Sequence, residues 1–186
     1  MANAAAAAAA AVALGLDIEE VAAGLGTAEA RSRWRMELHD RSDGVTVIND
    51  SYNANPESMR AALTTLAELG GTGRHTWAVL GDMLELGDSA ADEHAAIGRF
   101  AAEVGVEHLI AIGEYGAQVT SAAVTAGLAS SSAVVVADKP DAVREVTAGL
   151  GPGDVVLVKA SRGLALDTVA DDILTAVAAS AREGPG

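Results

Sequence analysis

The sequence predicts an α/β protein with a Rossmann-like, doubly wound and mostly parallel six-stranded sheet. An antiparallel strand lies at one edge of that sheet, and a short helical segment precedes it. Three observations predict this class. Short apolar segments alternate with amphipathic segments over most of the chain. The predicted strands are almost wholly apolar, as in parallel sheets covered on both faces. Half of the 186 residues are hydrophobic but only 3% are aromatic, so the core must consist of Ala, Val, Leu and Ile.

The first 32 residues predict two short helices and a linker. Residues 3–15 are almost all alanine and end at a glycine. Asp17 has Glu20 three residues later, which is the capping-box pattern at the start of a helix. Residues 27–33 are polar and are typical of a linker. The apolar run is too short to cross a bilayer and lacks a basic flank, so we expect a helix rather than a targeting segment.

Strands and helices alternate through the rest of the chain. Residues 40–44 are rich in turn formers between two short strands, which predicts a hairpin. Asn55 followed by Pro56 predicts a helix start, because Asn is a favoured N-cap and Pro a favoured first helical residue. The predicted strands are residues 34–39, 45–49, 75–80, 108–112, 133–136 and 154–159. The predicted helices are residues 56–69, 89–104, 115–127, 140–149 and 164–181.

Composition and missing motifs exclude several classes of function. The chain has 26 acidic and 12 basic residues and a formal charge of −14, which argues against a nucleic-acid or anionic-membrane partner. It has no cysteine, so disulfides, thiolate metal sites and cysteine nucleophiles are excluded. Its four histidines lack the spacing of metal ligands, and we expect no metal site. Neither a G-x-x-x-x-G-K-[ST] loop nor a G-x-G-x-x-G turn occurs, so the layout does not imply NAD binding.

Three polar loops follow predicted strands, at residues 50–55, 81–88 and 159–163. In open α/β sheets ligands bind outside the carboxyl ends of the strands, so we expect these loops to line one crevice. The first loop offers a carboxylate, a tyrosine ring and amides that could bind a ribose or a base edge. The same Asn and Asp residues could instead shape the turn and cap the next helix. For Asn55 both interpretations stay open.

The other two loops carry opposite charges. Glu85 could meet the ammonium group of a substrate, although a solvated loop would also explain the acidic residues here. Lys159, Ser161 and Arg162 could hold a carboxylate or a phosphate. A surface role for Arg162 remains an alternative. His94, inside a predicted helix, is expected to be structural.

Three motifs together resemble the Mur ligase family. They are Asp-Ser-Tyr-Asn-Ala-Asn-Pro-Glu-Ser-Met at 50–59, Leu-Gly-Asp-Met-Leu-Glu-Leu-Gly at 80–87 followed by His94, and Val-Leu-Val-Lys-Ala-Ser-Arg at 156–162. They occur in the family's order, and Ala160 departs from the more usual glycine. The resemblance implies that residues 33–186 are the family's carboxyl-terminal domain. It implies that residues 1–32 are the helical end of the central ATP-binding domain plus a linker.

The resemblance also implies an activity. Such ligases form an amide bond with ATP: the precursor carboxylate becomes an acyl phosphate, and an amine displaces the phosphate. The motifs are most similar to the members that add D-alanyl-D-alanine to UDP-N-acetylmuramoyl-tripeptide in peptidoglycan synthesis. The third domain closes over ATP and positions the dipeptide. The P-loop and the Mg²⁺ ligands lie in the central domain, so this chain alone is not expected to be active. We expect a cytoplasmic monomer.

The resemblance assigns roles to individual residues. Catalytic roles fall to Lys159 and Arg35, the latter reaching the ATP phosphates. A solvent-facing strand residue is the alternative for Arg35. The predicted ATP-binding residues are Asn3, Arg35, Asp50, Tyr52, Asn53 and Asn55. The predicted substrate-binding residues are Glu85, Lys159, Ser161 and Arg162.

Two other functions remain possible at this point. One is a non-catalytic α/β module that binds a small molecule, and the other is a purely structural interaction domain. The segment 49–56 together with Arg35 favours the ligase. A structural domain would explain the fold but not three polar loops at one edge of the sheet.

Overall fold

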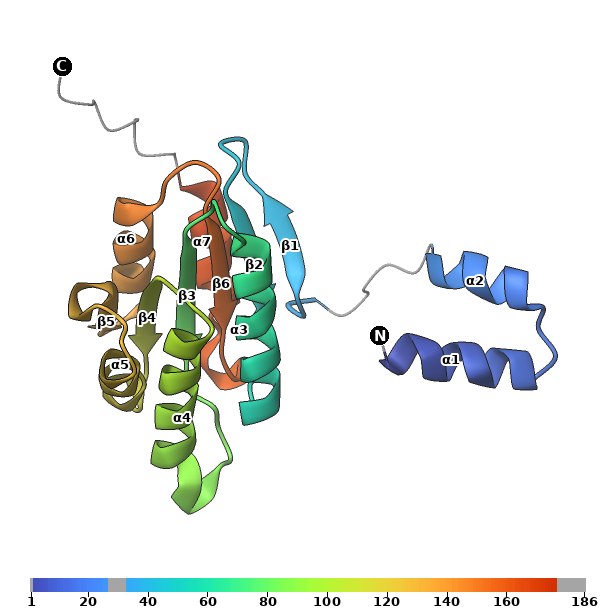
Figure 1. The fold of residues 1–186 in the computed structure, drawn as a ribbon, viewed down its shortest axis with the longest axis horizontal. Helices are drawn as coiled ribbons and strands as arrows, with labels where there is room; N and C mark the ends of the chain where they lie inside the picture. Colours follow the sequence, from blue (N-terminus) through green and yellow to red (C-terminus); the bar gives the residue numbers. More distant parts are fainter. Residues whose placement is uncertain (1, 27–32, 177–186) are drawn as a thin grey trace. The chain divides into compact units, whose positions relative to one another are not determined.

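The computed structural model describes residues 2–26 and 33–176. The chain divides into two compact units, Met1–Ser32 and Arg33–Gly186 (Figure 1). The linker predicted at residues 27–33 lies almost entirely outside the described residues.

The first unit consists of two helices, α1 (Ala2–Ala13) and α2 (Ile18–Gly26). Asp17 caps α2 by accepting a hydrogen bond from the Glu19 N–H at 2.7 Å. Leu14 and Ile18, beside the turn, are 85% and 69% exposed. These helices therefore carry apolar surface that they do not bury against each other.

The second unit contains one six-stranded sheet in the order β1-β2-β6-β3-β4-β5. Strand β1 runs antiparallel to β2, and every other neighbouring pair is parallel. The predicted fold class is therefore confirmed, including its antiparallel edge. The strands are β1 (Glu37–Asp40), β2 (Thr46–Asp50), β3 (Thr76–Gly81), β4 (His108–Ile112), β5 (Ala133–Val136) and β6 (Val155–Lys159).

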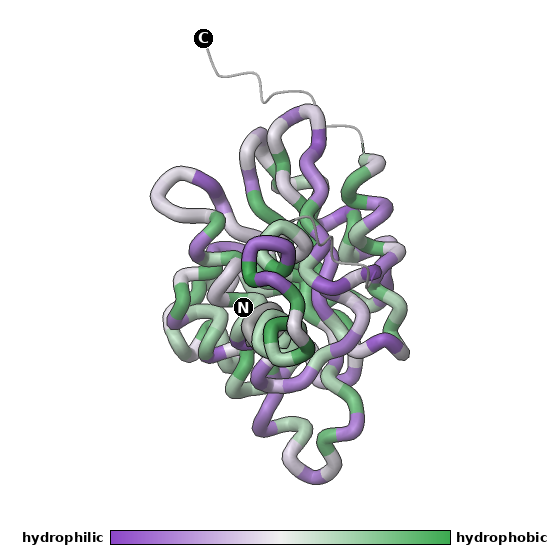
Figure 2. Tube along the Cα trace, turned by 90° about the vertical axis from the view of Figure 1, so that its right-hand side faces the viewer, coloured by the Kyte–Doolittle hydropathy of each residue, from purple (hydrophilic) through white to green (hydrophobic). Residues whose placement is uncertain are grey.

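Helices cover both faces of the sheet (Figure 1). One face packs against α3 (Pro56–Gly70), α4 (Ala90–Glu103) and α5 (Gly116–Thr125). The other packs against α6 (Lys139–Gly149) and α7 (Asp167–Thr175). Figure 2 shows hydrophobic and hydrophilic segments alternating along the chain. Burial on both faces explains why the strand sequences are continuous apolar runs.

Side-chain alternation along the adjacent strands β2 and β6 places two charged residues side by side. In β6, Leu157 packs in the core on the α3 face and Val158 in the core on the opposite face. The next residue, Lys159, therefore returns to the α3 face. In β2, Ile48 belongs to the α3 core, so Asp50 two residues later points the same way. Asp50 and Lys159 are register partners in adjacent parallel strands, which brings their side chains together.

Two predicted boundaries were wrong, for the same physical reason. The first strand begins at Glu37 rather than at residue 34, because Trp34 and Met36 have φ values of 60° and 48°. Such left-handed backbone is not extended, and it costs a bulky residue about 1–3 kcal/mol. The last helix begins at Asp167 rather than at residue 164, because Ala165 has a φ of 50°. A third predicted boundary was also wrong: the last helix ends at Thr175 rather than at residue 181, because the backbone of Ala176 is extended. The other described boundaries agree with the predicted ones within about two residues.

No helix in residues 2–26 or 33–176 is both long enough and apolar enough to cross a membrane.

Two histidines at the amino-terminal ends of β3 and β4 should titrate on opposite sides of the usual value of 6.5. A hydrogen bond to the Glu107 carboxylate raises the pKa of His75. Burial lowers the pKa of His108. An NMR pH titration of the imidazole resonances should therefore show His108 losing its proton first as the pH rises. Glu107→Gln should lower the pKa of His75.

These shifts fix the sign of the pH dependence of stability. The His75–Glu107 pair stabilises the fold below pH 6.5, and this contribution disappears as the pH rises through the raised pKa. Neutral His108 contributes above pH 6.5, and its contribution disappears as the pH falls through the lowered pKa. A His75 pKa in the Glu107→Gln variant that equals or exceeds the His75 pKa of the parent chain would contradict this account.

Candidate functional site

The three predicted loops meet at one edge of the sheet, and Ser161 joins them. Its N–H donates to the Asp82 carbonyl at 3.0 Å. Its hydroxyl accepts from the Leu84 N–H at 2.9 Å and approaches the Ala54 carbonyl, as donor, at 3.4 Å. Ser161 is almost fully buried. Its hydroxyl therefore connects the loops after β2, β3 and β6, in addition to any role with a substrate.

A cavity of about 310 Å³ opens between α3 and the segment that enters β1. Its lining combines apolar side chains with one guanidinium, one carboxylate, two amides and one ammonium. The lining residues are Arg35, Met36, Asp50, Asn53, Asn55, Ser58, Ala61, Ala62, Thr65 and Lys159. Of the predicted site residues with described side chains, Tyr52, Glu85, Ser161 and Arg162 lie outside this lining.

A buried ion pair forms the base of this site. The Lys159 ammonium lies 2.5 Å from Oδ2 of Asp50 and donates to the Asn53 carbonyl at 3.0 Å. Oδ1 of Asp50 accepts the Met36 N–H at 3.0 Å. Lys159 is only 1% exposed. Two of its three N–H donors are thus used inside the protein, which leaves little of this side chain for the predicted substrate contact.

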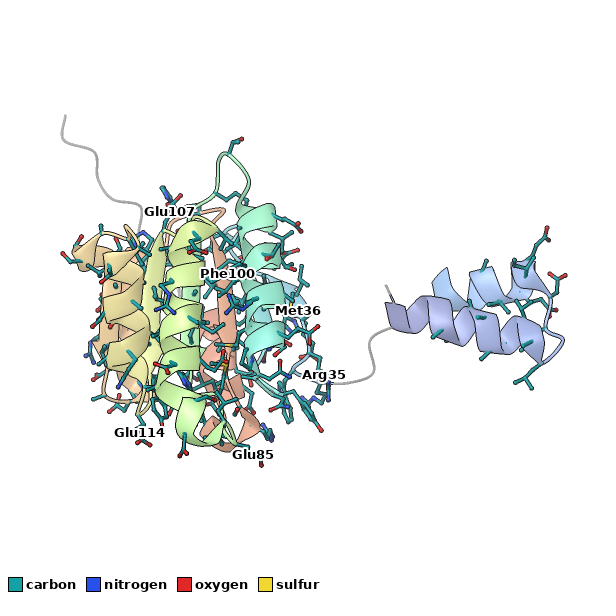
Figure 3. The ribbon with its side chains drawn as sticks, turned by 60° about the horizontal axis from the view of Figure 1, so that its bottom comes forward. Arg35, Met36, Glu85, Phe100, Glu107 and Glu114 are labelled. Atoms are coloured by element: carbon teal, nitrogen blue, oxygen red, sulfur yellow. The ribbon has the colours of Figure 1, made fainter. Side chains whose placement is uncertain are left out.

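Arg35 lies at the same edge in a different environment. Its guanidinium carbon is 4.0 Å from the centroid of the Tyr52 ring, a cation–π contact, and Tyr52 is 40% exposed. Figure 3 shows Arg35 and Glu85 toward the same end of the unit, with Glu107 at the other end. A stacked guanidinium keeps its N–H edge available for hydrogen bonds, so Arg35 suits an anionic group.

Arg162 stacks on a residue that we did not predict in the site. Its guanidinium carbon lies 4.0 Å from the Trp34 ring, and its Nη1 is 3.1 Å from the Asp167 carboxylate. Arg33 lies over the same indole at 5.3 Å. Trp34 also accepts the Tyr52 N–H on its carbonyl at 3.0 Å. In the sequence Trp34 stands directly between Arg33 and Arg35, and this pattern could have placed Trp34 in the site.

Asn55 acts as a helix cap. Its side-chain oxygen accepts the Ser58 N–H at 2.8 Å, and its own N–H donates to the Ser58 hydroxyl at 3.1 Å. This is a complete capping box. Because Asn55 also lines the cavity, capping and ligand binding are compatible at this position.

The buried side chain of His94 holds the loop after β3. His94 accepts the Met83 N–H on Nε2 at 2.9 Å, and its Nδ1 lies 2.6 Å from the Ala90 carbonyl. This pattern requires the neutral imidazole with its proton on Nδ1. His94 therefore has the structural contacts that we expected of it.

Asp82 has a role that the sequence did not reveal. Its carboxylate accepts the N–H groups of Glu114 and Tyr115, at 2.8 and 3.1 Å, where α5 begins. An anion at a helix start is favourable. By contrast, Glu85 is exposed at the loop tip with a φ of 65°.

Two further predictions concern Asn3 and metal binding. The side chain of Asn3 is not among the described side chains, although its backbone belongs to α1. No cluster of three or more His, Cys, Asp or Glu side chains able to hold a metal ion occurs in the described part of the chain.

Comparison with known proteins identifies related chains. The model of the Mur ligase, glutamate ligase domain family matches residues 34–162, more than half of the chain. The UDP-N-acetylmuramoyl-tripeptide–D-alanyl-D-alanine ligase of Mycobacterium tuberculosis is 45% identical over 77% of this chain and 31% of its own length. The ligase of the same name from Bacillus subtilis is 34% identical over 75% of this chain and 30% of its own length.

Solved structures give the same result. A crystal structure of MurF from Acinetobacter baumannii superposes with a TM-score of 0.80 and 31% identity. The match covers 94% of this chain and 37% of the MurF chain. The chain thus spans about a third of the length of the curated relatives it matches.

Substitution of Asn55 should separate its capping role from any other. Asn55→Ala removes the acceptor for the Ser58 N–H and should lower the free energy of unfolding by about 1 kcal/mol. Asn55→Asp keeps an acceptor and should change it by only a few tenths of a kcal/mol, or about zero. Urea unfolding of both variants measures this. Equal losses in the two variants would contradict the capping assignment.

Proposed function

Because the chain belongs to the Mur ligase family, we propose that it is part of an ATP-dependent, ADP-forming ligase that joins D-alanyl-D-alanine to UDP-N-acetylmuramoyl-tripeptide. This is the reaction named for the relatives that match it at 45% and 34% identity. The structural observation that carries the proposal is the cavity at the carboxyl edge of the sheet, which Arg35, Asp50 and two asparagines line. The product would serve peptidoglycan precursor synthesis.

We assign the two units to different domains of that ligase. Residues 33–186 would be the carboxyl-terminal domain, and residues 1–32 the helical end of the central ATP-binding domain plus a linker. The 94% coverage by the MurF structure exceeds what the second unit alone supplies, so the similarity extends into the helices. The exposed Leu14 and Ile18 support this assignment, because exposed apolar surface commonly packs against further protein.

The nucleotide would lie against the cavity. Arg35 would contact the ATP phosphates, while Asp50, Asn53 and Asn55 offer acceptors and donors for ribose hydroxyls or a base edge. Both Asp50 oxygens have a partner, yet a carboxylate oxygen can accept more than one hydrogen bond. The Tyr52 ring would hold the Arg35 guanidinium in place through their cation–π contact. Asn3 would contact the adenine from the first unit.

The incoming dipeptide would approach from the two other loops. Glu85 would meet its ammonium group, and Arg162 with Ser161 would hold its carboxylate or the acyl phosphate. The chain thereby supplies position and charge rather than a nucleophile. Holding the amine close to the acyl phosphate removes an entropic cost, and a fixed guanidinium stabilises the negative charge that develops.

The remaining parts of the reaction belong outside this chain. The sequence has no P-loop, so we place the P-loop that binds the ATP phosphates in the central domain. When bound, Mg²⁺ would neutralise phosphate charge, and we place its ligands in the central domain. We further propose a cytoplasmic monomer that uses these small molecules and contacts neither nucleic acid nor membrane.

The alternative is a non-catalytic module that binds a small molecule. It is favoured by the cavity, which the second unit forms from its own residues. The two functions differ in turnover. The ligase needs its other domains and releases ADP, whereas a binding module would release no ADP, whether alone or joined to other domains.

The proposal predicts a specific loss on removing Arg35. The chain should be joined to the amino-terminal and central domains of the Mycobacterium tuberculosis relative, and ADP release dependent on D-alanyl-D-alanine should be measured. Arg35→Ala should lower kcat/KM for ATP about 10- to 100-fold, because a charged hydrogen bond contributes about 1.5–3 kcal/mol.

Arg60→Ala is the matched control. Arg60 also stacks on an aromatic ring, that of Phe100 at 5.2 Å, but lies outside the cavity lining. Its removal should leave kcat/KM within about twofold, as expected for a surface substitution. Equal losses in both variants would count against the role of Arg35. ATP turnover by the 186-residue chain alone would contradict the division of the site between domains.

A further inference from the structure

The backbone around Arg35 is held in an unfavourable conformation on both sides. Trp34 and Met36, its two neighbours, have φ values of 60° and 48°. Bulky residues rarely adopt the left-handed region, and they remain there only when surrounding contacts enforce it. The contacts that enforce it therefore determine where Arg35 points.

Two hydrogen bonds fix this segment to the loop after β2. The Trp34 carbonyl accepts the Tyr52 N–H at 3.0 Å. The Met36 N–H donates to Oδ1 of Asp50, also at 3.0 Å. Arg35 lies between these two attachments, over the ring of Tyr52. The position of the Asp50 carboxylate thus sets one end of the segment.

Lys159 in turn sets the position of Asp50. Its ammonium binds Oδ2 of Asp50 at 2.5 Å and the Asn53 carbonyl at 3.0 Å. The two residues are opposite each other in neighbouring strands, and both are buried. Because the strands are rigid, the carboxylate has little freedom to rotate.

The pair also controls charge next to Arg35. None of the ion pairs among the described residues involves Arg35. The Asp50 carboxylate is neutralised by Lys159, so it competes less for the guanidinium. Arg35 thereby keeps its positive charge available for a ligand.

We propose that Lys159 is a positioning residue that acts through Asp50 and the Met36 N–H to hold Arg35 over Tyr52, facing the cavity. Its effect on catalysis rests on the proposed ligase function, whereas its effect on the position of Arg35 does not. A guanidinium already held in place loses less conformational freedom when the phosphate binds. Lys159 thus contributes without touching substrate.

The position of Arg35 can be measured in the 186-residue chain by NMR. In the parent chain the Tyr52 ring current should shift the Arg35 Nε–H resonance upfield. Lys159→Met should abolish most of that shift. The resonance of Arg60 over Phe100 is an internal control and should not move. Lys139→Met removes the other lysine, which binds the Ala165 carbonyl, and should preserve both shifts.

A double variant tests whether Lys159 acts through Asp50. Asp50→Asn combined with Lys159→Met leaves no buried unpaired charge, so it should fold even if Lys159→Met alone does not. Its Arg35 resonance should match that of Asp50→Asn alone. If the Arg35 resonance of the double variant differs from that of Asp50→Asn alone, so that the effects of the two changes add, the proposal is overturned.

Kinetics of the joined ligase provide the functional readout. Lys159→Met should raise the KM for ATP at least tenfold with a smaller change in kcat, and Lys139→Met should change neither. On an Arg35→Ala background, Lys159→Met should have little further effect. A full additional loss on that background would show a role independent of Arg35 and refute the proposal.

The two proposals fail separately. If the joined protein releases no ADP while the Arg35 resonance still depends on Lys159, the positioning role stands and the ligase assignment fails. If ADP release is normal while the resonance is indifferent to Lys159→Met, the ligase stands and the positioning role fails.

Discussion

The buried ion pair of Asp50 and Lys159 connects three segments of the second unit at the carboxyl edge of the sheet. A buried pair is favourable only when further hydrogen bonds satisfy both charges. Here the Asp50 carboxylate also accepts a hydrogen bond from the Met36 N–H, and the Lys159 ammonium also donates one to the Asn53 carbonyl. The segment entering β1, the loop after β2 and the end of β6 therefore depend on one another.

The distribution of charge gives this edge its character. The chain has a formal charge of −14, yet Arg33, Arg35 and Arg162 all stack on Trp34 or Tyr52 near the same loops. Aromatic faces hold guanidinium groups without neutralising them. Arginines gathered on an otherwise acidic protein can attract anionic ligands locally while the rest of the surface repels them.

The site has the form of one wall rather than an enclosed pocket. Its groups can orient a ligand and stabilise charge, but the sequence contains no P-loop motif to bind a triphosphate. This agrees with a chain that spans about a third of its relatives' length. Strain at Trp34 and Met36 lies where the second unit begins, close to the groups that would face the nucleotide.

The sequence by itself determined the fold class, the order of the strands and helices, and the placement of polar loops at strand ends, because periodicity and capping are local properties. The Asn55 cap was likewise readable from the residues around it. The tertiary structure decided the partners of Lys159 and Asp82. Lys159 meets Asp50 across 109 residues only because β6 inserts beside β2, and no local pattern encodes that register.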